Sequence, residues 1–424
     1  MKVLKKIVKV LLSIVLVLAA VLGISLNMKT VLAAHKNKAV IEAANPVAEF
    51  TIPEGVKIVG VGEASHGSVE FQELKLDVFQ ILVEKYDYRA FALEADFSDC
   101  LAVNEYIQGG EGDARDIANH FYFDIYRTQQ MADLVEWMRE YNASVPEDKR
   151  LRFYGFDLQN PQDGVVFLKN YMESHDITGA DTTNLDIWGD ENSTVSLTAE
   201  IMDNMRRELA AIEGVLPEDD DFDTICAHKL VENIGTALDY WAIEDMGEMI
   251  SFRDQAMAAN VSWLLELEQN LGTGKIMLAA HNAHIGKCPQ SVLYTCSMGG
   301  VLKEQYGDAY YSLGTDFFKG KSNIHATDTD ERKDFFVTTA DPMAYQAKYM
   351  EDHRYYMDFT SLDETDNAKV YNMVHEPMNT GSLGEGFCDA YYLMHSAYRL
   401  YEKPVNLYDG MIFYYEVAAI EPAE

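Results

Sequence analysis

A short stretch near the start of the chain, from Lys57 to Ser68, combines an apolar run with side chains that can move a proton. It reads KIVGVGEASHGS and places Glu63, Ser65 and His66 within four residues. An imidazole beside a carboxylate can take a proton from water near neutral pH, because the carboxylate stabilises the imidazolium that forms. We therefore predict that His66 is a general base whose activated water attacks a carbonyl group directly, and that Glu63 or Glu94 orients it.

Ser65 is the other potential nucleophile in this stretch, but its surroundings do not fit a serine hydrolase. A nucleophile elbow requires the pattern Gly-x-Ser-x-Gly, whereas Ser65 lies three residues after Gly62 and two before Gly67. We expect Ser65 to be a turn residue that hydrogen-bonds locally. The glycines lack the third member of a dinucleotide-binding fingerprint, so a tight turn is enough to explain them.

Ionisable side chains also follow each of four later apolar runs. They are Glu94 after RAFAL, Asp157 after LRFYGF, His281 and His284 after KIMLAA, and Asp316 after AYYSL. Ligands of open parallel sheets bind outside the carboxyl ends of the strands, so we expect these groups to meet His66 at one rim. Glu94 is then a second carboxylate beside the base, and His281 or His284 could donate to a developing oxyanion.

Two of these acids have an equally simple explanation. Asp157 and Asp316 could each cap the helix that follows a strand. We keep Asp157 as a candidate contact for the substrate.

The scaffold implied by the five runs is a parallel sheet. The runs are Lys57–Val61, Arg89–Leu93, Leu151–Phe156, Lys275–Ala280 and Ala309–Leu313. Each is continuously apolar rather than alternating, which is typical of strands covered by helices on both faces. The predicted fold class is α/β, with a largely parallel sheet flanked by helices.

Helical patterns lie between the runs. Residues from Ser68 to Tyr86 carry apolar side chains at helical spacing, with Glu70 in the first turn, and form the first crossover helix. Three further helical patterns between about residues 190 and 270 predict a helical insertion, which contains Arg253, a second candidate contact for the substrate. The acidic stretch Pro217–Asp223 lacks the ligand spacing of a calcium loop and is expected to be a solvated loop.

Composition fits a folded protein whose ligand is not a nucleic acid. The chain has 424 residues, of which 48% are hydrophobic, so it can bury one large core or two modest ones. Its net charge of -35 excludes a phosphate-binding groove, because such a groove needs clustered Lys and Arg. The expected partner is a neutral or cationic small molecule.

The first residues of the chain predict export. Four lysines within the first nine residues precede an apolar run from Val10 to Met28, and the sequence VLA at residues 31–33 fits a small-residue cleavage site. A run of roughly 20 apolar residues is also long enough to span a bilayer uncleaved.

Two interpretations of the N-terminus therefore stay open. Residues 1–34 are either a signal peptide or a membrane anchor, and in the second case residues 7–28 would hold the protein at the membrane. In both cases residues 35–424 are expected outside the cytoplasmic membrane, secreted or anchored.

The cysteines indicate neither a disulfide framework nor a zinc site. Five cysteines without a CxxC pair imply neither a zinc ribbon nor a complete disulfide set. Cys288 and Cys296 could form a bridge in an oxidising compartment, while separate thiols are the simpler expectation.

Four motifs together resemble the erythromycin esterase family. They are GEASHGSVEFQELK at residues 62–75, RAFALEADF at 89–97, FYGFDLQ at 153–159 and LAAHNAHIGK at 278–287. The resemblance runs from about Ile58 to Asp316, with a fainter echo in LGEGFCDAYYL at residues 383–393. It implies one α/β domain over residues 35–424, with the helical insertion at about 190–270.

The same resemblance implies a cleft in which an essential histidine activates water to open a macrolactone ester. It assigns that histidine to His66, with Glu63, Glu94, His281 and His284 around it. Lys75 stands where an arginine is expected on the first crossover helix, which keeps the charge but loses bidentate geometry. We take Lys75 as a further substrate contact, and we expect no cofactor and no metal.

Two alternatives remain at this point. Histidines with glutamates could also hold a first-row metal, which would make the chain a metal-dependent hydrolase or peptidase. The cleft could instead belong to a non-catalytic extracellular binding module, for which the 25 tyrosines are the sequence support. The export signal departs from a cytoplasmic role in drug inactivation, so the substrate is predicted only as an ester or lactone.

Overall fold

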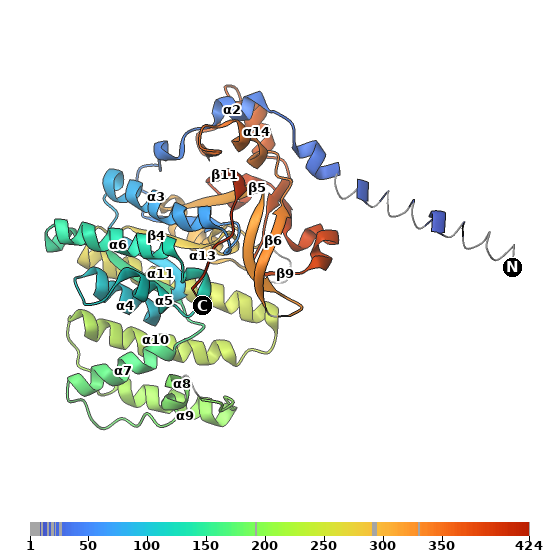
Figure 1. The fold of residues 1–424 in the computed structure, drawn as a ribbon. Helices are drawn as coiled ribbons and strands as arrows, with labels where there is room; N and C mark the ends of the chain where they lie inside the picture. Colours follow the sequence, from blue (N-terminus) through green and yellow to red (C-terminus); the bar gives the residue numbers. More distant parts are fainter. Residues whose placement is uncertain are drawn as a thin grey trace, which may run out of the picture.

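A largely parallel β-sheet forms the centre of the molecule (Figure 1). The computed structural model describes residues 28–190, 193–290, 295–329 and 331–423, together with residues 9, 12–14, 17, 21, 23 and 24. In spatial order the main strands are β3 (Arg152–Asp157), β2 (Ala90–Asp96), β4 (Ile276–His281), β1 (Ile58–Glu63), β5 (Tyr310–Ala326), β11 (Gly410–Val417) and β7 (Arg354–Asp358). Neighbours from β3 to β11 are parallel, and β7 is antiparallel to β11.

Shorter strands extend this sheet on one side. β6 (Arg332–Thr338) pairs antiparallel with β5, and β9 (Gly386–Phe387) pairs parallel with the end of β5. β8 (Met378–Gly381) and β10 (Arg399–Glu402) form a separate two-stranded antiparallel sheet. The predicted fold class is confirmed, and the antiparallel strands are an addition to it.

Both faces of the sheet are buried, which explains why the strands are apolar without interruption. In β2, Ala90 and Ala92 belong to one hydrophobic core, whereas Phe91 and Leu93 belong to the other. Successive side chains of a strand point to opposite faces, so each core covers one face.

Helices supply the other half of each core. The core around Phe91 is completed by α3 (Val69–Tyr86) and α6 (Gln129–Ser144). The opposite core includes α11 (Met246–Leu271) and α13 (Met298–Tyr306). α3 is the predicted crossover helix, and its end at Asp87 in the left-handed conformation, with φ of 60°, turns the chain toward β2.

A group of helices separates β3 from β4 along the chain. They are α7 (Gln162–Ser174), α8 (Leu185–Gly189), α9 (Ala199–Glu213), α10 (Phe222–Trp241) and α11. The three helical patterns predicted between 190 and 270 correspond to α9, α10 and α11, while helical structure begins earlier, at Gln162. In Figure 1, α7 to α10 lie together as the green layer at the lower end of the molecule.

The remaining helical segments are short and connect these elements. They are α2 (Lys38–Ala43), α4 (Phe97–Ile107), α5 (Ala114–Asn119), α12 (Asn282–Ile285), α14 (Ala368–Val374), α15 (Pro404–Leu407) and the 3-10 turns η1 (Val47–Glu49), η2 (Asp124–Tyr126), η3 (Glu147–Lys149), η4 (Gly307–Ala309), η5 (Ala344–Tyr349), η6 (Asp389–Leu393) and η7 (His395–Ala397).

All five predicted strands are present, but β5 is longer than its apolar run. Its first part pairs with β1 and β11, and its last part pairs with β6 and β9, so the strand continues through polar residues to Ala326. Asp316 therefore lies inside β5 and does not follow its end. The prediction that Asp316 marks a strand end, or caps a helix there, is wrong.

The N-terminal segment 1–34 falls largely outside the described residues, so the signal peptide and the anchor stay predictions. Among the residues that the structure describes, no helix is both long enough and apolar enough to cross a membrane. Cys288 and Cys296 are separate thiols, as are the other three cysteines.

Candidate active site

The carboxyl ends of β1, β2 and β4 bring the predicted catalytic residues together. β4 lies between β2 and β1, and Glu63 at the end of β1 is the register partner of His281 at the end of β4. The ring centres of His66 and His281 are 5.0 Å apart, and those of His281 and His284 are 6.5 Å apart. The convergence predicted from the strand ends is therefore observed for these histidines.

The turn after β1 holds His66 in place through its close approach to β5. A Cβ atom on Gly67 would lie 2.3 Å from the carbonyl oxygen of Asn323, so only glycine fits at this position. The N–H of Asn323 donates to the carbonyl of Gly67 at 2.9 Å. Ser65 is fully buried, and its Oγ accepts the N–H of Gly67 at 3.2 Å. This contact is the local turn bond expected for Ser65.

His66 is held by a buried ion-pair network on one side only. Its Nδ1 lies 2.7 Å from Glu63 Oε1, and the other oxygen of Glu63 accepts from Lys75 Nζ at 2.8 Å. Gln72 Nε2 donates to the backbone carbonyl of His66 at 3.1 Å and holds the backbone of His66 in place. Because Nδ1 faces the ionised carboxylate of Glu63, neutral His66 carries its proton on Nδ1 and has its lone pair on Nε2, to which no described residue hydrogen-bonds.

The charges around this pair shift both pKa values. Burial disfavours the charge of Glu63, but the ammonium of Lys75 and the imidazole of His66 outweigh burial and lower the pKa of Glu63 to about 2. Burial also disfavours the imidazolium of His66, but the hydrogen bond to Glu63 and the charges of Glu63 and Glu94 raise the pKa of His66 above its usual value. The charged form of His66 is thus stabilised by its partner.

A second network lies on the opposite side of the histidines and is built around Arg253 from α11. Its Nε and Nη2 donate to the two oxygens of Asp157 at 2.9 and 2.6 Å. Nη2 also donates to Glu94 Oε1 at 2.8 Å. Burial disfavours the guanidinium, but Asp157 and Glu94 keep the pKa of Arg253 well above its usual range.

His284 adds a second fixed positive charge to this network. Its Nδ1 lies 2.9 Å from Asp254 Oδ1, and its Nε2 lies 3.2 Å from Glu94 Oε1. Burial disfavours the imidazolium, but Glu94 and Asp254 outweigh burial and raise the pKa of His284 to about 10. Glu94 in turn has a pKa well below its usual range, because the positive charges of His284 and Arg253 overcome its burial.

His281 lies between the two networks and is neutral. Its Nδ1 accepts the N–H of Ala283 at 3.2 Å, and its Nε2 lies 3.2 Å from the carbonyl oxygen of Leu383, to which it donates. Burial and the nearby charge of His66 lower the pKa of His281 to about 3. Its backbone N–H donates to Glu94 Oε2 at 2.7 Å, which ties the end of β4 to β2.

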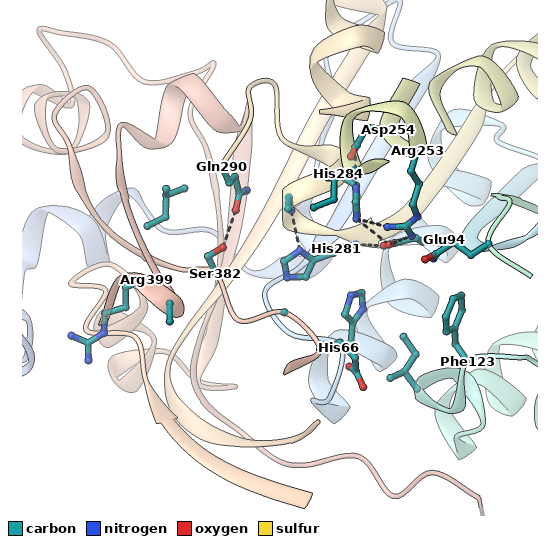
Figure 2. Close-up of a pocket in the computed structure, with 18 of the residues that line it drawn as sticks. His66, Glu94, Phe123, Arg253, Asp254, His281, His284, Gln290, Ser382 and Arg399 are labelled. Atoms are coloured by element: carbon teal, nitrogen blue, oxygen red, sulfur yellow. Dashed lines mark hydrogen bonds and ion pairs between the residues drawn. The ribbon is translucent and has the colours of Figure 1, made fainter. Parts of the chain in front are cut away.

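These side chains line a cavity of about 650 Å³. Figure 2 shows His66 on one wall, with Glu94, Arg253 and His284 grouped across from it. Phe123, Ile125 and Tyr126 supply an apolar wall near His66. At the other end the cavity is bordered by Gln290, Ser382 and Arg399, and Ser382 Oγ donates to Gln290 Oε1 at 3.1 Å.

Glu63, which contacts His66, is buried and is not among the residues that line this cavity, and three further predicted residues do not reach it either. Lys75 is 3% exposed and is enclosed between Glu63, Gln72 and the ring of Tyr126. The carboxylate of Asp157 is fully buried behind Arg253. Direct substrate contacts by Lys75 and Asp157 are not supported by this placement, because each already pairs with a charged residue of the site.

The third residue that does not reach the cavity is Asp316. It is fully buried, and its carboxylate accepts the N–H groups of Phe317 at 2.7 Å and Gly381 at 2.6 Å. Burial and the neighbouring Asp341 raise the pKa of Asp316 well above its usual range, so a proton stays on this pair of acids. Arg253, in contrast, does line the cavity, as expected of a substrate contact.

Two acids of the site had not been predicted. Asp254 is the partner that keeps His284 charged, and it follows Arg253 directly in the sequence. Glu385 lines the cavity from the loop before β9, and its Oε2 is buried without a hydrogen-bond partner among the described residues. Glu385 lies in the motif LGEGF, which was the only sequence signal available for it.

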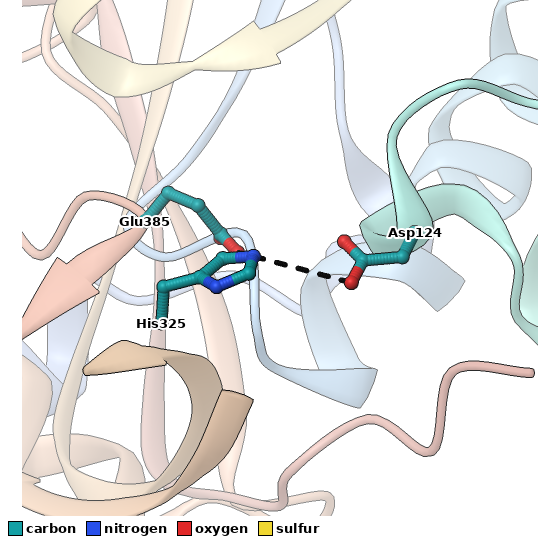
Figure 3. A group of neighbouring side chains, drawn as sticks. All are labelled: Asp124, His325 and Glu385. Atoms are coloured by element: carbon teal, nitrogen blue, oxygen red, sulfur yellow. Dashed lines mark ion pairs between the residues drawn. The ribbon is translucent and has the colours of Figure 1, made fainter. Parts of the chain in front are cut away.

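Glu385 also belongs to a cluster beside the cavity with Asp124 and His325 (Figure 3). In the described part of the chain this is the one group of three whose donor atoms could hold a metal ion, within 4.8 Å of one another, and it includes no cavity histidine. Arg332 donates to Asp124 from Nε and Nη2, both at 2.9 Å, and Nη2 also donates to Glu385. The guanidinium of Arg332 therefore already forms ion pairs with both carboxylates. These contacts connect η2, β6 and the loop before β9.

The whole arrangement places a proton acceptor opposite a hydrogen-bond donor. His66 Nε2 can accept a proton, while the Nη1 group of Arg253, which has no carboxylate partner, can donate to an oxygen that gains negative charge in the cavity. Such a site suits the attack of water on a carbonyl carbon.

Comparison with known proteins identifies the family of the chain. The sequence model of the erythromycin esterase family matches residues 83–417. Erythromycin esterase type II of Escherichia coli is 26% identical over 318 residues, which are 66% of this chain and 74% of that protein. A crystal structure of a Bacillus cereus protein superposes with a TM-score of 0.75 at 20% identity, covering 93% of this chain and 99% of that one. A histidine-to-asparagine mutant of the erythromycin esterase EreC in its open conformation gives 0.56 at 16% identity, covering 87% and 92%.

Proposed function

The chain belongs to the erythromycin esterase family and is a hydrolase, and from this premise we propose that it cleaves a carboxylic ester or lactone with water activated by His66. The observation that carries the proposal is the asymmetry of His66. Its Nδ1 is engaged by Glu63 at 2.7 Å, while its Nε2 has no partner among the described residues and lies in the cavity.

The first step is proton removal from water. His66 Nε2 accepts a proton from a water molecule while the oxygen of that water attacks the carbonyl carbon of the substrate. The Nδ1–H stays bonded to Glu63, whose charge stabilises the imidazolium that forms. Glu63 is therefore a positioning residue, and Lys75 keeps Glu63 ionised.

The second step is stabilisation of the tetrahedral oxyanion. Arg253 donates to carboxylates from Nε and Nη2. Its Nη1 lies 3.2 Å from His284 Nε2, which cannot accept a hydrogen bond while His284 is protonated, so Nη1 is the donor available to the substrate. His284 adds positive charge but already uses both ring nitrogens. His281 is neutral, so it is a weaker candidate for this role than Arg253.

The last step returns the proton. The imidazolium of His66 donates it from Nε2 to the leaving alkoxide as the carbon–oxygen bond breaks. The products are an acid and an alcohol, which stay on one molecule if the substrate is a lactone. No covalent enzyme intermediate is needed.

A substrate panel tests this proposal. Purified protein and its His66→Ala variant would be assayed with matched esters, lactones and amides, and mass spectrometry would follow the intact protein during turnover. We expect cleavage of esters or lactones by the unaltered protein alone, with no increase in protein mass. An acyl adduct on Ser65, or equal rates for the two proteins, would contradict the mechanism.

We further propose that this reaction takes place outside the cytoplasmic membrane. The support is the sequence of residues 1–34, with its lysines, apolar run and small residues at 31–33. Cell fractionation with N-terminal sequencing would decide between a cleaved peptide and a retained anchor. Recovery of the full chain in the cytoplasmic fraction would contradict export.

A further inference from the structure

An exposed apolar surface lies outside the cavity, on the C-terminal part of the chain. Its members are Phe336, Tyr392, Leu393, Met394 and Tyr401, with 48, 37, 61, 55 and 66% of each residue exposed. We call these five residues the apolar patch. Single exposed apolar side chains are ordinary, but a group of them marks a surface that contacts another body.

Hydrogen bonds hold the elements of the patch together. Tyr392 Oη donates to the carbonyl of Phe336 at 3.0 Å, which joins η6 to β6. Arg399 and Tyr401 are two residues apart in β10, so their side chains lie on the same face of that strand. Arg399 Nε donates to the carbonyl of Thr338 in β6 at 3.0 Å, and its Nη1 lies 3.2 Å from His395 Nδ1 in η7. One buried guanidinium thus ties β6, η7 and β10 together.

The N-terminal segment leaves the fold beside this patch. Lys29 Nζ donates to Asn379 Oδ1 in β8 at 3.4 Å and lies 6.0 Å from the ring centre of Tyr401. Burial, the charge of Arg399 and, to a smaller extent, the charge of Lys29 lower the pKa of His395. In Figure 1 the blue helix that ends at Ala33 departs on the same side as β6 and β9.

The segment that departs here is the apolar run of residues 10–28. Its described large side chains are all exposed, among them Leu12, Val17 and Ile24 at 60, 61 and 65%. Four lysines precede the run. Roughly 20 apolar residues next to lysines match the apolar core and the anionic headgroups of a bilayer.

We propose that the apolar patch docks on the surface of a lipid bilayer into which residues 10–28 insert. Because Lys29 lies against both the run and the patch, insertion of the run brings the patch to the headgroup region. Leucine and methionine can enter the acyl boundary there, and tyrosines favour the interface itself. This proposal goes beyond the hydrolytic reaction and does not depend on it.

Charge restricts the docking to this side of the molecule. With a net charge of -35, other faces are repelled by anionic lipid, whereas the lysines before and after the apolar run favour it. Ser396, Ala397 and Leu400, which belong to the same segment as the patch, line the cavity. Docking would therefore set this wall of the cavity close to the bilayer.

Fluorescence quenching by brominated lipid tests the contact directly. The full chain would be bound to vesicles of phosphatidylcholine and phosphatidylglycerol with brominated acyl chains, as the unaltered protein and as the Tyr401→Trp and Met246→Trp variants. Met246 is 72% exposed at the start of α11, which contributes no residue to the patch, and it serves as the matched control. We expect extra quenching for Tyr401→Trp and none for Met246→Trp. Equal quenching of the three proteins would overturn the proposal.

Vesicle affinity provides a second readout. The double change Leu393→Ser and Met394→Ser should weaken binding about tenfold or more, because two exposed apolar side chains no longer enter the lipid. Met246→Ser should leave the affinity unchanged. If the double variant binds as well as the unaltered protein, or if the patch instead forms a dimer in detergent that the double change dissolves, the bilayer is not its partner.

Discussion

The two sides of the cavity differ in how completely their charges are matched. On the side of His66, one carboxylate, Glu63, serves both a lysine and the histidine, and the second nitrogen of the histidine has no partner among the described residues. On the side of Arg253, carboxylates engage most of the donors of Arg253 and both nitrogens of His284.

This difference separates a group that can change charge from groups that cannot. The pKa of His66 is raised above its ordinary value, and only one of its ring nitrogens is engaged by a carboxylate. His66 can therefore gain and lose a proton during turnover. The pKa of His284 is raised to about 10, so its charge persists at neutral pH. In the proposed mechanism, histidine therefore serves as the base on one side and as a fixed charge on the other.

The largest expected effect is loss of the base. His66→Ala should reduce kcat by about two to four orders of magnitude, because a positioned proton acceptor is removed, while ligand binding is retained. Steady-state kinetics with a binding assay would measure both. Ser65→Ala is the matched control from the same turn and should keep most of the activity. A His66→Ala variant with unaltered kcat would remove the distinction between the two sides.

The next largest effect is expected on the fixed-charge side. Arg253→Gln leaves the buried carboxylates of Asp157 and Glu94 without their main partner, which should lower the free energy of unfolding by about 3–5 kcal/mol. Denaturant unfolding would measure this change. Arg206→Gln, whose ion pairs on α9 are exposed, should cost about 0–1 kcal/mol. Equal costs for the two variants would mean that Arg253 is not buried among charges as described.

A smaller effect is expected on the pH dependence. His66 is a base only above its own pKa, so kcat/KM should rise as pH increases through that value. Glu63→Gln removes the charge that raises the pKa of His66, and the rising limb should move to lower pH by about one unit or more. The limb should be absent in His66→Ala. A limb that Glu63→Gln leaves in place would show that Glu63 does not contact the base.

The smallest effect concerns Glu385, whose charge also contributes to raising the pKa of His66. Glu385→Gln should move the limb in the same direction as Glu63→Gln but by less, since no hydrogen bond joins Glu385 to His66 among the described contacts. A pH profile of kcat/KM would measure both variants together. A larger shift for Glu385→Gln than for Glu63→Gln would reverse the assignment of the orienting carboxylate.

The sequence was sufficient to predict the site residues that lie at the ends of strands. Glu63, Glu94 and His281 come at the carboxyl ends of β1, β2 and β4, and parallel pairing of those strands is sufficient to bring them together. The predicted resemblance to the erythromycin esterase family is confirmed by the match over residues 83–417.

The remaining roles depended on contacts between segments distant in sequence. Lys75 was predicted to contact substrate from the family resemblance, and the sequence does not show that its ammonium is already engaged by Glu63. Asp316 was misplaced because its strand continues through polar residues once β6 and β9 pair with it. Glu385 reaches the cavity from the loop before β9, and the spacing of apolar residues does not predict where such a loop lies.

The most direct test is a pH titration of the ring nitrogens of the three cavity histidines by NMR, with each assigned through its own substitution. We expect pKa values in the order His281, His66, His284, with His281 near 3, His66 above its ordinary value of about 6.5 and His284 near 10. We also expect neutral His66 to carry its proton on Nδ1. A pKa of His66 below that of His281, or a proton on Nε2 of neutral His66, would contradict the assignment of His66 as the base.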